Sequence, residues 1–125
     1  MKKQKIVIIE DEHSISEMYK YKLKYDGYDV YTASNSWDGI DLVNKVHPDL
    51  LLLDILMPYE NGISTLTKLQ KNNMNKNLKV LFMTNSDLQS VPDNIKNVDY
   101  NRYVLKCNTT PKQVSQMVKE ELQLK

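Results

Sequence analysis

Residues 48–58 read PDLLLLDILMP, so four consecutive leucines lead directly into Asp54. A short, wholly apolar run bounded by turn-forming residues is typical of a strand covered on both faces, as in parallel sheets. We therefore predict a central strand over 50–53, with Asp54 at its carboxyl end.

Four other short apolar runs lie at 6–9, 28–32, 80–83 and 103–105. The run 6–9 is continuously apolar and predicts a second central strand. The run 28–32 places Tyr28, Val30 and Thr32 on one face, and this alternation predicts an edge strand.

Helical patterns occupy the segments between these runs. The residues Ser-Ile-Ser-Glu at 14–17 fit a capping box, and Pro111 after Thr110 fits the start of the last helix. Apolar residues recur at helical spacing after these starts and within 36–46 and 62–71. They are Ile15, Met18 and Tyr19, then Trp37, Ile40 and Val43, then Ile63, Leu66 and Leu69, and finally Val114, Met117, Val118 and Leu122.

Two segments carry weaker patterns. Pro92 interrupts the stretch 86–98, so we expect a short or bent element there. The Asn-rich stretch 72–77 is predicted to be a surface loop. With these included, strand and helix patterns alternate five times, which predicts an α/β fold with a doubly wound, five-stranded parallel sheet and helices on both faces. Residues 1–125 are predicted to form one domain.

The composition excludes several functional classes. Seventeen basic and 16 acidic residues give a formal net charge of +1, unlike the basic field of a nucleic-acid-binding protein, so no direct nucleic-acid binding is expected. The apolar runs are far shorter than a membrane span, and the lysine-rich start lacks the apolar region of a signal peptide. The single cysteine, Cys107, cannot form an internal disulfide, so a cytoplasmic location is expected.

Polar residues stand at the predicted carboxyl ends of four strands. They are Glu10 and Asp11 after the first run, Asp54 after the third, Thr84 after the fourth and Lys106 after the fifth. Ligands of open parallel sheets bind beyond these ends. The sequence therefore predicts three carboxylates, a hydroxyl and an ammonium at a single edge.

This combination of groups fits phosphoryl transfer. Clustered carboxylates repel one another unless a cation neutralises them, and Mg²⁺ prefers such oxygen ligands. A carboxylate can act as a nucleophile toward phosphorus, and the transferring group needs a cation and hydrogen-bond donors around it. Asp54 is the nucleophile candidate because it follows the most buried-looking strand, while Glu10 and Asp11 are predicted to hold the metal. Lys106 and Thr84 would supply the charge and the donor.

The chain resembles the receiver domains of two-component response regulators, of the chemotaxis-protein type, from about Lys5 to Leu122. The matching residues are Ile8-Ile9-Glu10-Asp11-Glu12, the whole segment 48–58, Asn61-Gly62, Met83-Thr84 and Tyr103-Val104-Leu105-Lys106. This resemblance implies a flavodoxin-like fold with strand order 2-1-3-4-5. It also implies a signalling switch rather than an enzyme, in which Asp54 accepts a phosphoryl group from a phosphohistidine.

The resemblance further implies partners and roles for individual residues. The donor would be a sensor histidine kinase or a histidine phosphotransfer protein, and the downstream partner is unknown. Mg²⁺ would be bound by Asp11, Asp54 and the backbone carbonyl of Leu56, with Glu10 assisting. Thr84 and Tyr103 would rearrange on phosphorylation. The responding surface, which could also form a homodimer, would comprise the fourth helix, the fifth strand and the last helix.

Two departures from the family pattern leave alternatives open. Cys107 stands where a proline usually follows Lys106, so either a trans peptide that shifts the lysine or a strained peptide is expected. Asn85 replaces a residue that is usually small. These departures favour, as a second hypothesis, a binding module of the same fold that does not use phosphate. A phosphatase with an aspartyl phosphate ranks lower, because Leu56 occupies the position where such enzymes commonly carry a second acid.

Overall fold

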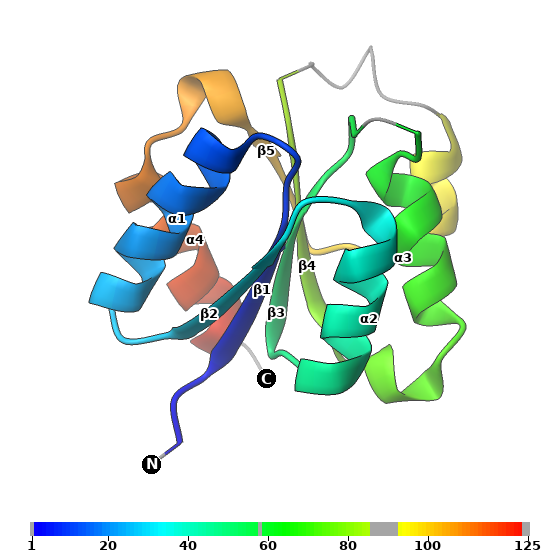
Figure 1. The fold of residues 1–125 in the computed structure, drawn as a ribbon, viewed down its shortest axis with the longest axis horizontal. Helices are drawn as coiled ribbons and strands as arrows, with labels where there is room; N and C mark the ends of the chain where they lie inside the picture. The colour runs from blue at the N-terminus through cyan, green and yellow to red at the C-terminus, as the bar shows by residue number, and fades with distance from the viewer. Residues whose placement is uncertain (1, 58, 86–92, 124–125) are drawn as a thin grey trace.

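In a computed structural model that describes residues 2–57, 59–85 and 93–123, the chain forms a five-stranded parallel sheet (Figure 1). The strand order is β2-β1-β3-β4-β5, as the resemblance implied. The strands are β1 (Lys5–Ile9), β2 (Asp29–Ala33), β3 (Leu50–Asp54), β4 (Lys79–Thr84) and β5 (Arg102–Leu105). The predicted edge position of the run 28–32 is confirmed, because β2 pairs only with β1 among the described strands.

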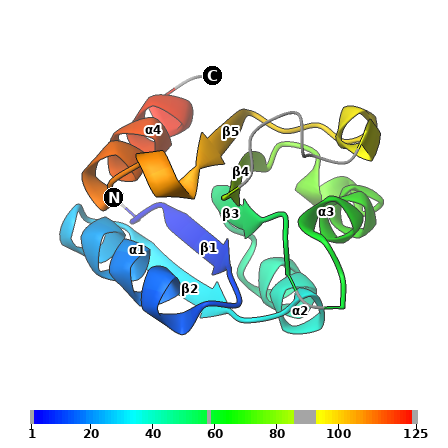
Figure 2. The same cartoon turned by 90° about the horizontal axis from the view of Figure 1, so that it is seen from above.

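Helices cover both faces of this sheet, as Figure 2 shows. The helices α1 (His13–Tyr25) and α4 (Pro111–Gln123) lie on one face, and α2 (Ser36–Val46) and α3 (Gly62–Gln70) lie on the other. Short 3-10 helices are η1 (Asn73–Asn75), η3 (Asp93–Asn97) and η4 (Lys106–Asn108). Alternate residues of the central strands point to the two faces, so each face has its own hydrophobic cluster.

The two central strands are buried over their whole apolar length. Leu50 to Leu53 of β3 are all inaccessible to solvent, and so are Ile6 to Ile9 of β1. Leu51 and Leu53 pack toward α2 and α3, whereas Leu50 and Leu52 pack toward α1 and α4. Burial on both faces explains why these strands lack polar alternation.

The last helix begins as its sequence predicts. The Thr110 hydroxyl accepts a hydrogen bond from the backbone N–H of Gln113 at 3.2 Å, and the Gln113 side chain accepts one from the Thr110 N–H at 2.8 Å. This reciprocal pair is a capping box, with Pro111 in the first turn. Val114 and Val118 are fully buried beneath it.

Two predictions about helices are wrong. Helix α1 begins at His13 with Glu12 in the capping position, and no side chain caps it, so Ser14 lies inside the helix. In α2 the prediction holds for Val43, which is buried, and for Ile40, which packs against the core, but Trp37 is 66% exposed and Ser36 and Gly39 are buried instead. A Cβ at Gly39 would overlap the side chain of Ile9, so α2 approaches β1 closely along its small residues.

The weak segments differ in outcome. The stretch 72–77 holds the 3-10 helix η1, and the buried Asn75 side chain donates to the carbonyl of Leu69 at 2.9 Å, so it is not a simple surface loop. Of the stretch 86–98, residues 93–97 form the short element η3, in line with the expected break. Pro92 and the other residues of 86–92 lie outside the described residues.

Candidate functional site

The strand register places the predicted site residues at one edge of the sheet. Ile9 of β1 pairs with Leu53 of β3, so Glu10 and Asp54, the next residues, are neighbours. Thr84 ends β4 opposite Leu105 of β5, which places Lys106 one residue beyond. Because all strands run in parallel, these residues lie at the shared carboxyl edge.

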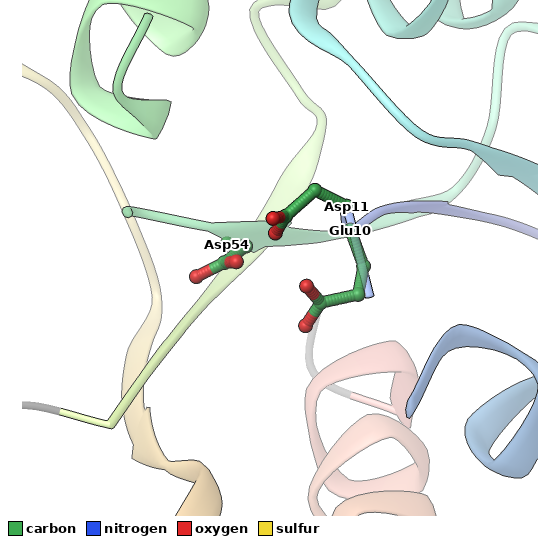
Figure 3. Close-up of side chains that lie close together, drawn as sticks. All are labelled: Glu10, Asp11 and Asp54. Carbon is green, nitrogen blue, oxygen red and sulfur yellow. The ribbon is translucent and has the colours of Figure 1, made fainter. Parts of the chain in front are cut away.

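Three carboxyl groups converge where β1 and β3 end (Figure 3). One carboxylate oxygen from each of Glu10, Asp11 and Asp54 lies within 4.8 Å of the others. Glu10 is 1% exposed and Asp54 is 2% exposed, whereas Asp11 is half-buried. The cluster therefore combines high negative charge with little water to screen it.

Lys106 is the positive group of the cluster. Its Nζ lies 2.7 Å from Glu10 Oε1 and 3.3 Å from Asp54 Oδ2. Burial alone would lower the pKa of Lys106, but the hydrogen bond that its ammonium donates to Glu10 and the charges of both acids outweigh this effect, so the pKa is raised. No described peptide bond is cis, so Lys106 reaches the acids although a trans peptide joins it to Cys107.

The acidic surroundings disfavour ionisation of Asp54. Burial, followed by the charge of Glu10, raises the pKa of Asp54 to about 8, although Lys106 opposes this shift. When Asp54 is ionised, one ammonium does not neutralise the three carboxylates. A further cation at this place would therefore relieve a repulsion that the fold itself creates.

Backbone N–H groups orient two of the carboxylates. The N–H of Leu56 donates to Asp54 Oδ1 at 3.2 Å, and the N–H of Glu12 donates to Glu10 Oε2 at 3.1 Å. Gly62, the first residue of α3, donates its N–H to the carbonyl of Ile55 at 2.7 Å. A Cβ at Gly62 would overlap the backbone carbonyl oxygen of Asp54, so only glycine allows this approach.

Sequence reasoning did not assign a role to Gly62 or to the N–H groups of Leu56 and Glu12. Gly62 belongs to the Asn-Gly pair that carried part of the resemblance, and a glycine at a helix start is a signal of close backbone approach. The two N–H contacts depend on the local path of the chain after each strand, which residue types alone do not specify.

The remaining predicted residues lie around this centre. Thr84 is 1% exposed at the end of β4. Tyr103 of β5 is partly buried against the cluster beneath α2 and α3, and it pairs in register with Phe82. Leu56 directs an exposed side chain outward, and Asn85 is also exposed. Asn85 therefore does not fill the space between the acids.

The donor set fits a hard divalent cation. Mg²⁺ binds oxygen at 2.0–2.1 Å, so ligands on opposite sides of the ion are about 4.2 Å apart, close to the 4.8 Å within which the three oxygens lie. Asp11 and Asp54 can contribute one oxygen each, and Glu10 lies beside them. The half-exposed position of Asp11 leaves room for the waters that Mg²⁺ usually keeps.

A polar cavity of about 420 Å³ adjoins the acidic cluster. It lies against Glu10, and its lining includes His13 and Ser16 of α1, Thr32 of β2 and Asp38 of α2. These groups can form hydrogen bonds with a ligand, and Ala33 and Leu42 are also part of the lining.

Comparison with known proteins identifies the class. A family model described as the response regulator receiver domain matches residues 6–119. The chain belongs to this family. Receiver domains are phosphoacceptor switches of two-component signal transduction and interact with histidine kinases, and the Glu10, Asp11 and Asp54 cluster is consistent with their acidic phosphoacceptor and Mg²⁺ site.

Solved structures of this class share the fold over nearly the whole chain. The N-terminal domain of a response regulator/sensory box/GGDEF three-domain protein from Carboxydothermus hydrogenoformans is 28% identical, with a TM-score of 0.84 over 96% of this chain and 94% of that one. A putative response regulator from Chloroflexus aurantiacus is 25% identical, with a TM-score of 0.86 over 98% and 100%. Chemotaxis response regulator CheY4 of Vibrio cholerae is 20% identical and matches in fold, with a TM-score of 0.87 over 95% and 98%. Among the described helices of the present chain, none has the length and apolarity needed to cross a bilayer.

Proposed function

We propose that Asp54 is the phosphoacceptor of a Mg²⁺-dependent switch that receives its phosphoryl group from a phosphohistidine of a sensor kinase or phosphotransfer protein. The observation that carries this proposal is the placement of the Asp54 carboxylate, 3.3 Å from the Lys106 ammonium and beside two further acids. A nucleophile, a fixed cation and a site for a second cation thus meet at one point. A donor of this kind would act on the chain in the cytoplasm.

In the transfer, an oxygen of Asp54 forms a bond to phosphorus as the phosphorus–nitrogen bond of the donor breaks and the imidazole leaves. Asp11, Asp54 and the Leu56 carbonyl, assisted by Glu10, would hold Mg²⁺. The ion would supply charge neutralisation for the acids and the incoming phosphoryl oxygens. Lys106, which contacts Glu10 and Asp54 before the transfer, would then also contact those oxygens and partly neutralise their charge.

The same proposal assigns the response to Thr84 and Tyr103. Thr84 ends the strand next to β3 and carries a hydroxyl that can donate to a phosphoryl oxygen. Movement of Thr84 would alter the space beside Tyr103 on the neighbouring strand, and the change would reach a downstream protein or a second copy through β5, α4 and residues 93–98. Thr84→Ala is expected to accept phosphate yet show smaller amide shifts in β5 than the wild type on phosphorylation.

Phosphorylation with a small donor tests the central assignment. The full chain is incubated with acetyl phosphate, with and without Mg²⁺, and its intact mass is measured. We expect one added phosphoryl group in the presence of Mg²⁺ and none for Asp54→Asn. Asp41→Asn, which removes an exposed acid of α2, is the matched control and should be modified like the wild type. Full modification of Asp54→Asn would refute the assignment.

A further inference from the structure

A second cavity lies away from the acidic cluster, in a groove between α1 and α4. It has a volume of about 860 Å³ and is lined by both helices, by the turn after α1 and by residues 2–4. Residues 2–4 and the end of α4, which line it, lie at the edge of the sheet opposite the carboxyl ends of the strands (Figure 1). The groove is therefore a separate surface from the phosphoacceptor site.

Helix α4 lines this groove with a polar stripe. Ser115 and Gln116 lie three and four residues after Lys112, and Lys119 lies four and three residues after them, so the four residues share one side of the helix. Val114 and Val118, which are buried in the core, mark the opposite side. Ser115 is buried, whereas Lys112, Gln116 and Lys119 are exposed and are not needed for packing against the sheet.

The groove is strongly positive although the chain as a whole is nearly neutral. Five lysines line it, namely Lys2, Lys3, Lys22, Lys112 and Lys119, against a single acid, Asp26. The formal net charge of the whole chain is only +1. This concentration of charge in one cavity is therefore a local feature.

The acid of the groove is already engaged. Asp26 accepts a hydrogen bond from the Ser115 hydroxyl and forms an ion pair with Lys22 at 3.2 Å. The Ser115 hydrogen bond lowers the pKa of Asp26, so the group remains ionised. Within the described ranges the other four lysines form no ion pair, which leaves their charge for an external anion.

We propose that this groove binds a small molecule carrying several adjacent phosphate groups. Clustered lysines are suited to phosphate oxygens as mobile point charges, and the volume falls in the range of small-ligand sites. Tyr28 and Leu122 are the only large apolar side chains of the lining, too few for insertion into a lipid surface. The near-neutral chain also lacks the extended basic field that a nucleic-acid backbone requires.

Calorimetric titration of the full chain with inorganic tripolyphosphate tests the proposal. The titration is done in EDTA, so that the metal-free acidic cluster repels the anion. We expect one site, whose affinity falls with added salt and drops about tenfold or more in the double variant Lys112→Gln/Lys119→Gln. Glutamine keeps the helix propensity of both positions. The control, Lys45→Gln/Lys96→Gln, removes the same charge from exposed positions outside the groove and should bind within about twofold of the wild type.

Two further titrations identify the ligand class. Equal affinities for tripolyphosphate and ATP would show that the groove recognises the phosphates alone. A higher affinity for ATP would show an additional contact to the nucleoside. Both results support the proposal. Three results overturn it: no binding of either anion, an equal loss in the control variant, or binding of a polyglutamate peptide without binding of tripolyphosphate. The Asp54→Asn variant should bind tripolyphosphate with the same affinity as the wild type. The test of the groove therefore does not depend on whether Asp54 is the phosphoacceptor.

Discussion

Burial and the charge of Glu10 raise the pKa of Asp54 to about 8, whereas an aspartate in an unfolded chain has a pKa of about 3.9. The folded state therefore binds a proton that the unfolded state releases between these values. The stability from this group is fully present below about pH 4 and is lost as pH rises through about 8.

This linkage predicts that Asp54→Asn stabilises the metal-free protein. Because the amide carries no charge at any pH, the variant should exceed the wild type by about 1–3 kcal/mol in free energy of unfolding at pH 8 and above, with a smaller difference at pH 5. Urea unfolding in EDTA across this pH range measures the difference. A difference that does not change with pH would contradict the raised pKa.

A second prediction concerns Tyr59, which follows the β3 end. It has a φ of 71°, and its side chain is 99% exposed. A non-glycine residue in this conformation costs about 1–2 kcal/mol, and the exposed ring contributes no core packing in return. Tyr59→Gly should therefore raise the free energy of unfolding by about 0.5–1 kcal/mol after the entropic loss of glycine is subtracted. Tyr59→Ala is the matched control, since it removes the ring but keeps the Cβ, and it should give no such gain in thermal unfolding.

At the scale of elements, the start of α3 fixes the position of the Asp54 backbone. A Cβ at Gly62 would overlap a backbone oxygen, which cannot move without shifting β3, whereas a Cβ at Gly39 would overlap only side-chain atoms of Ile9, which can shift without moving the backbone. We predict that Gly62→Ala costs about 2–4 kcal/mol and Gly39→Ala less, and that only Gly62→Ala slows phosphorylation by acetyl phosphate. Chemical denaturation and intact-mass kinetics of both variants provide the measurement. Equal effects on phosphorylation would argue against a positioning role for α3.

The strands were predicted from sequence more reliably than the faces of the helices. The sequence Leu50 to Leu53 predicts a strand clearly, because a strand buried on both faces of a sheet has an apolar residue at every position. Ile40 and Val43 of α2 pack as predicted, but the prediction for Trp37 was wrong, because the close approach of α2 at Gly39 leaves Trp37 in solvent. Hydrophobicity alone favoured the large residue. Likewise, Ser14 and Glu17 match a capping pattern, but the chain already turns into the helix at His13.

The candidate site was predictable to the same extent as the strands. Once the strands are parallel, residues at their ends must meet at one edge, so the grouping of Glu10, Asp11 and Asp54 follows from their positions in the sequence. The direction of the Lys106 side chain could not be predicted from its position in the sequence, because it depends on the path of η4, which contains the unusual Cys107. The basic groove was also missed, since it joins residues 2–4 to helices that are remote in sequence.

At the scale of the whole molecule, binding of Mg²⁺ should stabilise the fold. A cation that binds only the folded state adds about 3 kcal/mol at a concentration 100 times its dissociation constant. Thermal unfolding should therefore move to higher temperature with added Mg²⁺ in the wild type, and much less in Asp11→Asn, which lacks one proposed ligand. The same midpoint shift in both proteins would indicate that Mg²⁺ binds elsewhere.

The contact between Lys106 and Glu10 spans 96 residues of chain and crosses from the end of β5 over β4 and β3 to the end of β1. Such a contact requires that the sheet be assembled, so it is expected to form after the rate-limiting step of folding. Lys106→Met would leave two buried acids without their cation and should destabilise the protein by about 2–3 kcal/mol. Stopped-flow measurements should then show unfolding accelerated about tenfold or more with a nearly unchanged refolding rate. The contact of Lys106 with Glu10 would thus determine the lifetime of the native state rather than the rate at which it forms. Slower refolding of the variant would instead show that this contact forms early in folding.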